Sequence, residues 1–266
     1  MQRQLAMLPR YNKTLEKLDL RSFVDIMSEQ DQAIMIDLMK VLTDTLEESN
    51  ITHFIEAGTL LGSWRHHDII PWDDDMDVVV FEKDRHAVMM ALEKLQPDYM
   101  SVHLGVRFKF YSKKSKKTSY DPWHWPYIDV NIYAENASHL WDSSPISSKP
   151  VYPKDHIFPT HKRPLGDLSL YAPKDSFAML REYFGWSVEC RSKYYSHIRG
   201  SRINDSVTVP CKILKSVFPF VHRTMSESGI KETLKFNDVT IHSITVSEPV
   251  YALTEPYALI LQNNTK

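Results

Sequence analysis

The densest group of chemically active side chains is an acidic run between residues 68 and 77. Its five carboxylates are Asp68, Asp73, Asp74, Asp75 and Asp77. Because like charges this close repel one another, the run indicates a bound cation. Alternate residues of a strand share a face, so Asp73, Asp75 and Asp77 are expected to project together, with Asp74 and Met76 on the other side. Carboxylate oxygens on one face are ligands that Mg²⁺ or Mn²⁺ prefers.

An acidic surface turn without any ligand is the simpler interpretation of this run, and it stays open. A calcium loop of the EF-hand type does not fit. Neither possible first residue, Asp68 or Asp73, is followed by both a Gly at the sixth position and a Glu at the twelfth.

A glycine-containing segment lies just upstream of the acidic run. Gly58 and Gly62 are two of only seven glycines in the chain. A Gly62-Ser63 turn that enters a helix would offer backbone N–H groups and a hydroxyl to phosphate, and Arg65 would add a guanidinium. A phosphate-binding turn and metal-binding carboxylates this close together predict a metal-nucleotide site.

Asp129 is the best candidate for a third carboxylate. It is a lone acid in the apolar segment Tyr127–Tyr133, which reads as a strand, and Asp is disfavoured in the middle of strands. The alternative is a solvated strand face on which Asp129 has no role.

Histidines and aromatic residues near these acids have two readings each. His66 could contact a donor phosphate, but one ring of an adjacent His pair is often packed in the core. Four aromatic residues near Asp129 could form a sugar-stacking platform or belong to the core, namely Trp123, Trp125, Tyr127 and Tyr133.

The elements that must position these residues follow from hydrophobic periodicity and turn signals. Helices are predicted at 31–49, 82–95 and 175–184, and strands at 53–57, 75–81, 99–104, 106–111, 127–133, 168–171, 238–246 and 250–253. Lys113–Lys117 reads as a solvated hairpin tip, and 142–164 as an irregular excursion. This order predicts an α+β domain with a mixed β-sheet flanked by helices and a small C-terminal accessory region.

Three segments together resemble the signature of the LicD/fukutin-type (fukutin-related) nucleotidyltransferase family: Gly58–Ser63, Arg65-His66 and Ile70–Val78. Looser similarity follows at Ile128–Ile132, Ile157–Pro159, Leu165–Pro173 and Tyr183–Gly185. The resemblance implies an N-terminal extension over 1–30, a catalytic domain over 31–200 and an accessory segment over 201–266.

The family's fold is polymerase-β-like, with a Gly-Ser helix start, an Asp-x-Asp pair on one strand and a third acid on a neighbouring strand. Carried over by position, Gly62 and Ser63 supply the first element, Asp75 and Asp77 the second, and Asp129 the third. The resemblance then implies two Mg²⁺ or Mn²⁺ ions at the three acids. Donor phosphate would be bound by Gly62, Ser63 and Arg65, with possible support from Asp73 and His66.

Characterised members of this family move phosphocholine or ribitol phosphate from a CDP-activated donor to a glycan hydroxyl. The implied reaction is an in-line displacement at phosphorus, in which Asp129 could accept the proton of the acceptor hydroxyl. A CDP-linked donor and a glycan or glycoprotein acceptor are therefore the expected partners. Unlike some animal relatives, this chain shows neither a cysteine-rich zinc insert nor an N-terminal membrane anchor.

Two other functions stay open. The chain could be a catalytically idle module that binds nucleotide or glycan, or a nucleotidyltransferase that acts on nucleic acid or a small drug-like acceptor. A formal charge of −2 over 266 residues, with 32 basic and 34 acidic side chains, counts against nucleic acid. No apolar run approaches the roughly 18 residues of a membrane span.

Compartment signals come from asparagine and cysteine. Five of the eight asparagines begin the glycosylation pattern Asn-x-Ser/Thr: Asn12, Asn50, Asn136, Asn204 and Asn263. Chance predicts about one. The excess favours the secretory-pathway lumen (Golgi or ER), with a cytoplasmic location as the alternative. The only two cysteines, Cys190 and Cys211, could form one disulfide bond or stay reduced.

Overall fold

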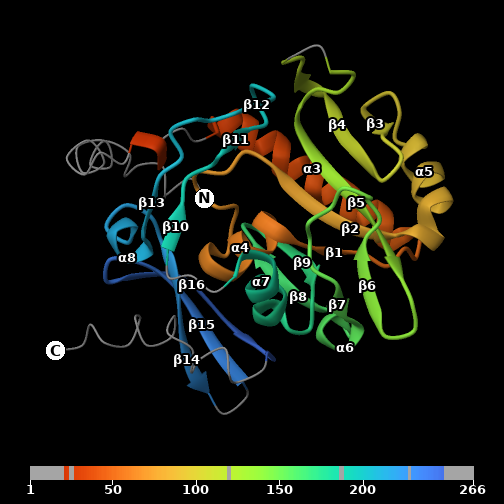
Figure 1. Cartoon of the computed structure of the whole chain (residues 1–266). Coiled ribbons are helices and arrows are strands. Elements are labelled where there is room, and N and C mark those ends of the chain that lie inside the picture. The colour runs from red at the N-terminus through yellow and green to blue at the C-terminus, as the bar shows by residue number, and fades with distance from the viewer. Residues whose placement is uncertain (1–20, 24–26, 119–120, 186–188, 227–228, 249–266) are drawn as a thin grey trace.

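A computed structural model describes residues 21–23, 27–118, 121–185, 189–226 and 229–248 (Figure 1). The predicted strand at 250–253 and most of the predicted N-terminal extension lie outside this part of the chain.

The centre of the molecule is a mixed sheet in the order β1-β2-β5-β4-β3. Its strands are β1 (Phe54–Ile55), β2 (Met76–Phe81), β3 (Tyr99–His103), β4 (Arg107–Lys116) and β5 (Trp125–Glu135). β2 and β5 run parallel, and the other neighbours are antiparallel. Two short strands extend the sheet from β5, namely β6 (His139–Asp142) and β7 (Tyr152–Pro153). β2 is apolar from Val78 onward and lies in the core, as predicted for a buried strand.

Helices pack along this sheet. Ser28 caps the N-terminus of α3 (Glu29–Glu48) by accepting a hydrogen bond from the Asp31 amide, and the helix packs its buried face on β4 and β5. The 3₁₀ helix η2 (Glu82–Asp84) leads into α5 (Arg85–Glu93), which packs on α3 and β3. α4 (Ala57–His66) contacts β2 and α7 (Ser176–Phe184). The predicted α+β class with a mixed, helix-flanked sheet is confirmed.

Three local predictions need correction. The segment after Gly58 is one helix, α4, that already begins at Ala57. Lys113–Lys116 belongs to β4 and not to a hairpin tip, because β4 continues to Lys116, which pairs with Trp125 of β5. The supposedly irregular segment 142–164 contains β7, the short helix α6 (Lys154–Ile157) and β8 (His161–Leu165), which pairs with β9 (Leu168–Ala172). Short polar strands escape prediction because their stability comes from tertiary packing.

A small lobe follows α7. β10 (Glu189–Arg191) pairs with β13 (Thr208–Pro210), and β11 (Tyr195–Ser196) pairs with β12 (Ser201–Arg202). Cys190 and Cys211 form a disulfide bond across the base of this lobe, next to the short helix α8 (Cys211–Leu214). A second hydrophobic cluster joins the lobe to the rest of the protein. It includes Trp72 and Phe23, and Phe23 belongs to the 3₁₀ helix η1 (Arg21–Phe23).

The C-terminal sheet contains β14 (Phe220–Ser226), β15 (Gly229–Phe236) and β16 (Val239–Val246). Ile230 and Val246 of this sheet join the main hydrophobic core. Figure 1 shows the sheet beside α4, which β14 contacts. The domain boundary at residue 200 stays a prediction.

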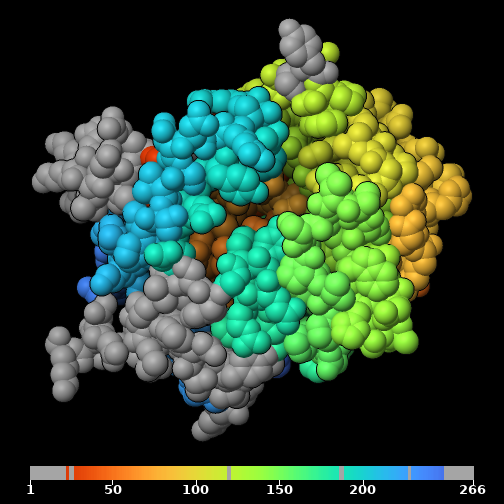
Figure 2. All heavy atoms as spheres, in the orientation of Figure 1, coloured from red at the N-terminus to blue at the C-terminus, as the bar shows by residue number. Residues whose placement is uncertain are grey.

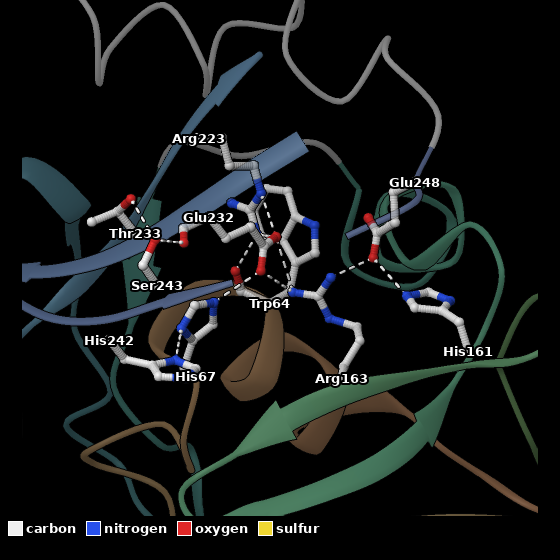
Figure 3. Close-up of polar contacts among 10 residues, drawn as sticks. All are labelled: Trp64, His67, His161, Arg163, Arg223, Glu232, Thr233, His242, Ser243 and Glu248. Atoms are coloured by element: carbon white, nitrogen blue, oxygen red, sulfur yellow. Dashed lines mark hydrogen bonds and ion pairs between the residues drawn. The ribbon is translucent and has the colours of Figure 1, made fainter. Parts of the chain in front are cut away.

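A buried ionic network holds the C-terminal sheet to α4 and β8 (Figure 3). Glu232 accepts hydrogen bonds from Arg163 at 2.8 Å and from Arg223 at 2.9 Å, and Nε2 of His67 lies 2.9 Å from the same carboxylate. Arg163 also pairs with Glu248. Every negative charge in this network therefore faces a positive partner.

None of the helices among the described residues is both long enough and apolar enough to cross a bilayer.

Candidate active site

The register of two neighbouring strands brings the predicted acids together. Asp77 on β2 is the lateral partner of Asp129 on β5, and Asp75 immediately precedes β2. Carboxylate oxygens of Asp75, Asp77 and Asp129 all lie within 4.8 Å of one another. The solvated-face alternative for Asp129 is wrong, since the residue is only 5% exposed.

The alternation predicted for the acidic run is also confirmed. Asp73, Asp75 and Asp77 are partly exposed, whereas Asp74 and Met76 are buried. The pKa of Asp75 is raised well above its ordinary value by burial and by repulsion from Asp73 and Asp77. Burial and the charge of Asp129 raise the pKa of Asp77 to about 7. The cluster therefore carries a negative charge that its protein neighbours do not balance.

Lys109 partly offsets this charge. It lies opposite Asp129 in the β4–β5 pairing, and its Nζ lies 2.8 Å from the Asp129 carboxylate. The ammonium also sits 4.1 Å from the centre of the Tyr127 ring. The position of Lys109 between the buried Phe108 and Phe110 was a signal that sequence reasoning overlooked.

A hydrogen-bonded network of mostly buried side chains holds the Asp77 carboxylate in place. Asn131 Nδ2 donates to Asp77 at 2.9 Å and to the fully buried Glu56 at 2.9 Å. Glu56 also accepts from Tyr133 at 2.6 Å and from Lys149 at 2.8 Å. Asn131 shares a strand face with Asp129, so the sequence could have suggested it. Lys149 lies 93 residues from Glu56, and no local pattern pointed to it.

The helix that faces the acids begins earlier than predicted. The turn expected at Gly62-Ser63 is wrong, because both residues lie inside α4. Gly58 occupies the first turn instead, and a Cβ atom there would come within 2.9 Å of an Asp73 carboxylate oxygen. Thr59 Oγ1 accepts a 2.7 Å hydrogen bond from the Asp77 amide. The first turn of α4, at Gly58 and Thr59, is therefore the helix terminus next to the acidic cluster.

Close packing explains why position 62 is a glycine. A Cβ atom at this position would lie 2.5 Å from the Asp68 carbonyl oxygen and 2.9 Å from the Ile70 amide nitrogen. Ser63 is fully buried, and its hydroxyl makes no hydrogen bond among the described residues. These two residues thus let the chain after α4 fold back closely against the helix.

Arg65 and His66 point into the second hydrophobic cluster. The Arg65 guanidinium lies 5.5 Å from the centre of the Trp72 ring, and its Nε donates to His66 Nε2 at 3.1 Å. His66 Nδ1 lies 2.7 Å from the Pro219 carbonyl oxygen. Burial, reinforced by the Arg65 charge, lowers the pKa of His66 well below its ordinary value. Both His66 ring nitrogens are engaged within the protein.

Asp74 and His197 form a second, unpredicted cluster beside the first. Burial opposes ionisation of Asp74, but a hydrogen bond from His197 and the charge of Lys193 outweigh it and lower its pKa. The other ring nitrogen of His197 lies 3.2 Å from Asp75. His197 is 123 residues away from Asp74, so sequence reasoning had no signal for it.

Figure 2 shows a hollow in the surface between the turquoise lobe, the green segment that follows β5 and the teal α7, with orange chain from the region of α4 and β2 at its floor. Trp125, Tyr127 and Tyr133 are buried and belong to the core, whereas Trp123 is partly buried against it. The interpretation of Trp125, Tyr127 and Tyr133 as core residues is therefore confirmed.

The donor atoms of the acidic cluster suit a hard divalent cation. Asp75, Asp77 and Asp129 supply only oxygen, and with Lys109 they carry a formal net charge of about two negative units when ionised. The raised pKa values of Asp75 and Asp77 are the expected sign of carboxylates held together at such a site.

Comparison with known proteins agrees with the sequence resemblance. The model for the "LicD/FKTN/FKRP, nucleotidyltransferase domain" family matches residues 50–175. The uncharacterized protein RP689 of Rickettsia prowazekii is 30% identical over 158 residues, which is 57% of this chain and 54% of that protein. The lipopolysaccharide cholinephosphotransferase LicD of Haemophilus influenzae is 24% identical over 56% of this chain and 53% of its own length. The ribitol-5-phosphate transferase FKTN of Mus musculus is 24% identical over 40% of this chain and 22% of that protein.

The chain thus spans about half the length of the first relatives it matches. Among solved structures, the lincosamide antibiotic adenylyltransferase LnuA with lincomycin bound matches 72% of this chain and 99% of that chain, at 14% identity and a TM-score of 0.38. The family match covers both β2 and β5, with all three clustered acids. Residues 50–175 of this chain match the nucleotidyltransferase domain of the LicD/FKTN/FKRP family.

Proposed function

We propose that this chain transfers a phosphate-linked group, such as phosphocholine or an alditol phosphate, from a CDP-activated donor to a hydroxyl of a glycan. The observation that carries the proposal is the convergence of three carboxylates within 4.8 Å of one another, in a domain that matches a family whose named members are phosphate-group transferases. Mg²⁺ or Mn²⁺ is the proposed cofactor.

Asp75 and Asp77 hold the cation in this proposal, with Asp129 as the third ligand. A bound divalent ion would lower the pKa of the acceptor hydroxyl and neutralise charge on the CMP leaving group. One ion balances the three acids together with Lys109, so the second ion expected from the family needs the donor phosphates as further ligands. Asn131 and Thr59 fix Asp77 through its side chain and its backbone.

The donor diphosphate is proposed to bind next to the first turn of α4. Backbone N–H groups at a helix N-terminus favour anions, and the lack of a side chain at Gly58 already lets the Asp73 carboxylate lie close to this terminus. Asp129, whose carboxylate lies 2.8 Å from Lys109 Nζ, is proposed to receive the proton of the acceptor hydroxyl.

A donor screen tests the proposal. Purified protein is heated with CDP-choline, CDP-ribitol, CDP-glycerol or CDP in Mg²⁺, and the hits are assayed for transfer to glycans. One CDP-linked compound should raise the unfolding temperature and release CMP when an acceptor is added. Stabilisation by a CDP compound without any turnover would support the idle binding module instead. No stabilisation by any CDP compound would contradict the proposed donor.

We also propose that the chain works in the lumen of the secretory pathway. Asn50, Asn136 and Asn204, the three glycosylation asparagines in the described part of the chain, are all exposed, and Cys190 and Cys211 are disulfide-bonded. Asn12 and Asn263 lie outside the described residues. Protein secreted from eukaryotic cells behind a signal sequence should shift on a gel after glycosidase treatment. An unshifted band would count against this location.

A further inference from the structure

His197 contacts two neighbouring carboxylates at once. Its Nδ1 lies 2.9 Å from Asp74 Oδ1, and its Nε2 lies 3.2 Å from Asp75 Oδ2. Asp74 is fully buried, so one side of the imidazole ring is held by a fixed group. The other side faces a carboxylate of the acidic cluster.

The fixed side of this arrangement is well supported. Asp74 Oδ2 lies 3.4 Å from both Lys193 Nζ and Ser196 Oγ, and its backbone carbonyl accepts a 2.8 Å hydrogen bond from Trp125 Nε1. The His197 ring lies edge-on to Tyr127 and Tyr195. Its plane is therefore set by the surroundings rather than by Asp75.

The lobe that carries His197 is tied to the catalytic domain. His197 directly follows β11, within the segment closed by the Cys190–Cys211 disulfide bond. The indole N–H of Trp72 donates to the Arg191 carbonyl oxygen at 2.9 Å, so the lobe is anchored beside the turn that leads into the acidic run. This segment lies beyond residue 175, where the family match ends.

We propose that His197 is a positioning residue for Asp75: its Nε2 fixes the Asp75 carboxylate in the orientation that faces Asp77 and Asp129. Asn131 Nδ2 donates to the Asp77 carboxylate, and His197 Nε2 takes the corresponding place beside the carboxylate of Asp75, which lies just before β2. Groups that orient a metal ligand in this way raise metal affinity without touching the metal. The inference rests on the proposed function, since it assumes that the three acids bind a divalent ion.

The test is the dissociation constant for Mn²⁺, measured on the purified full chain by electron paramagnetic resonance of the free ion. His197→Ala should weaken Mn²⁺ binding by about 10- to 100-fold. Tyr194→Ala is the matched control, because Tyr194 lies in the same lobe and is 64% exposed. It should bind Mn²⁺ like the wild type.

Two further variants separate positioning of Asp75 from a merely structural contact with Asp74. A glutamine amide reaches the place of Nε2, whereas an asparagine amide reaches only the place of Nδ1. His197→Gln should therefore restore most of the Mn²⁺ affinity, and His197→Asn should stay as weak as His197→Ala. Better rescue by asparagine would overturn the proposal, and so would a His197→Ala affinity within about twofold of wild type. If the wild type itself bound no Mn²⁺, the proposed function would fail first and this inference with it.

Discussion

Two buried charge clusters of this protein are built in opposite ways. In the network around Glu232, arginines face every carboxylate; burial opposes ionisation of Glu232, but the charges of Arg163 and Arg223 outweigh it and lower its pKa. In the cluster around Asp77, acids face acids, and burial together with Asp129 raises the pKa of Asp77 to about 7. The balanced network around Glu232 connects two parts of the fold. The unbalanced charge around Asp77 is what we expect of the proposed cation site.

The largest expected effect is on catalysis. Asp75→Asn and Asp77→Asn should each lower transfer by at least about a thousandfold, because each removes several kcal/mol of interaction with the metal. Stability without metal should stay level or rise, since each variant relieves repulsion. Steady-state kinetics in Mg²⁺ and thermal unfolding in EDTA measure the two effects. Near-normal activity of either variant would refute the metal assignment.

Removing a charge from the balanced cluster should have the reverse outcome. Arg163→Met leaves buried Glu232 and Glu248 with fewer positive partners, so it should cost about 3–5 kcal/mol of unfolding free energy. Chemical denaturation measures this loss. Exposed Arg202 on β12 is the control, and Arg202→Ala should change stability by less than about 0.5 kcal/mol. Equal effects of the two variants would show that the network does not hold the C-terminal sheet.

Asp129 combines both behaviours. It belongs to the acidic cluster, but it is also paired with buried Lys109. Asp129→Asn should therefore lower both activity and stability, the latter by about 1–3 kcal/mol, because Lys109 loses its charged partner. From the sequence alone we would expect the loss of the Asp129 carboxylate to have little effect on stability. Denaturation of Asp129→Asn beside Asp77→Asn decides between these expectations, since only the former should unfold more readily.

The smallest effect is the pH dependence of stability in EDTA. The folded-state pKa of Asp77 is raised from 3.8 to about 7, so its contribution is favourable below pH 3.8 and is lost as pH rises to about 7. Glu232 has a lowered pKa, so its contribution is present above pH 4.5 and is lost as pH falls. Asp77→Asn should therefore gain stability relative to wild type between about pH 4 and 7. A difference that does not vary with pH would contradict the raised pKa.

The sequence predicted the parts of the site that depend on local geometry. Alternation along β2 separates Asp75 and Asp77 from Asp74, and a lone acid in the apolar strand β5 identified Asp129. The sequence did not predict the start of α4 at Ala57. Ala57 adopts a left-handed backbone conformation (φ 48°), which is usually expected at glycine or asparagine and not at alanine. Lys149 and His197 could not be predicted, since separate segments bring them in from a distance along the chain.

The central claim is that the unbalanced cluster is a cation site. Its most direct test is anomalous diffraction from crystals of the full chain grown in Mn²⁺. We predict a peak bounded by carboxylate oxygens of Asp75, Asp77 and Asp129, at about 2.0–2.3 Å from its ligands, and no peak in Asp77→Asn crystals. Wild-type crystals without a peak at these three residues, under conditions where donor analogue and Mn²⁺ are both present, would contradict the account.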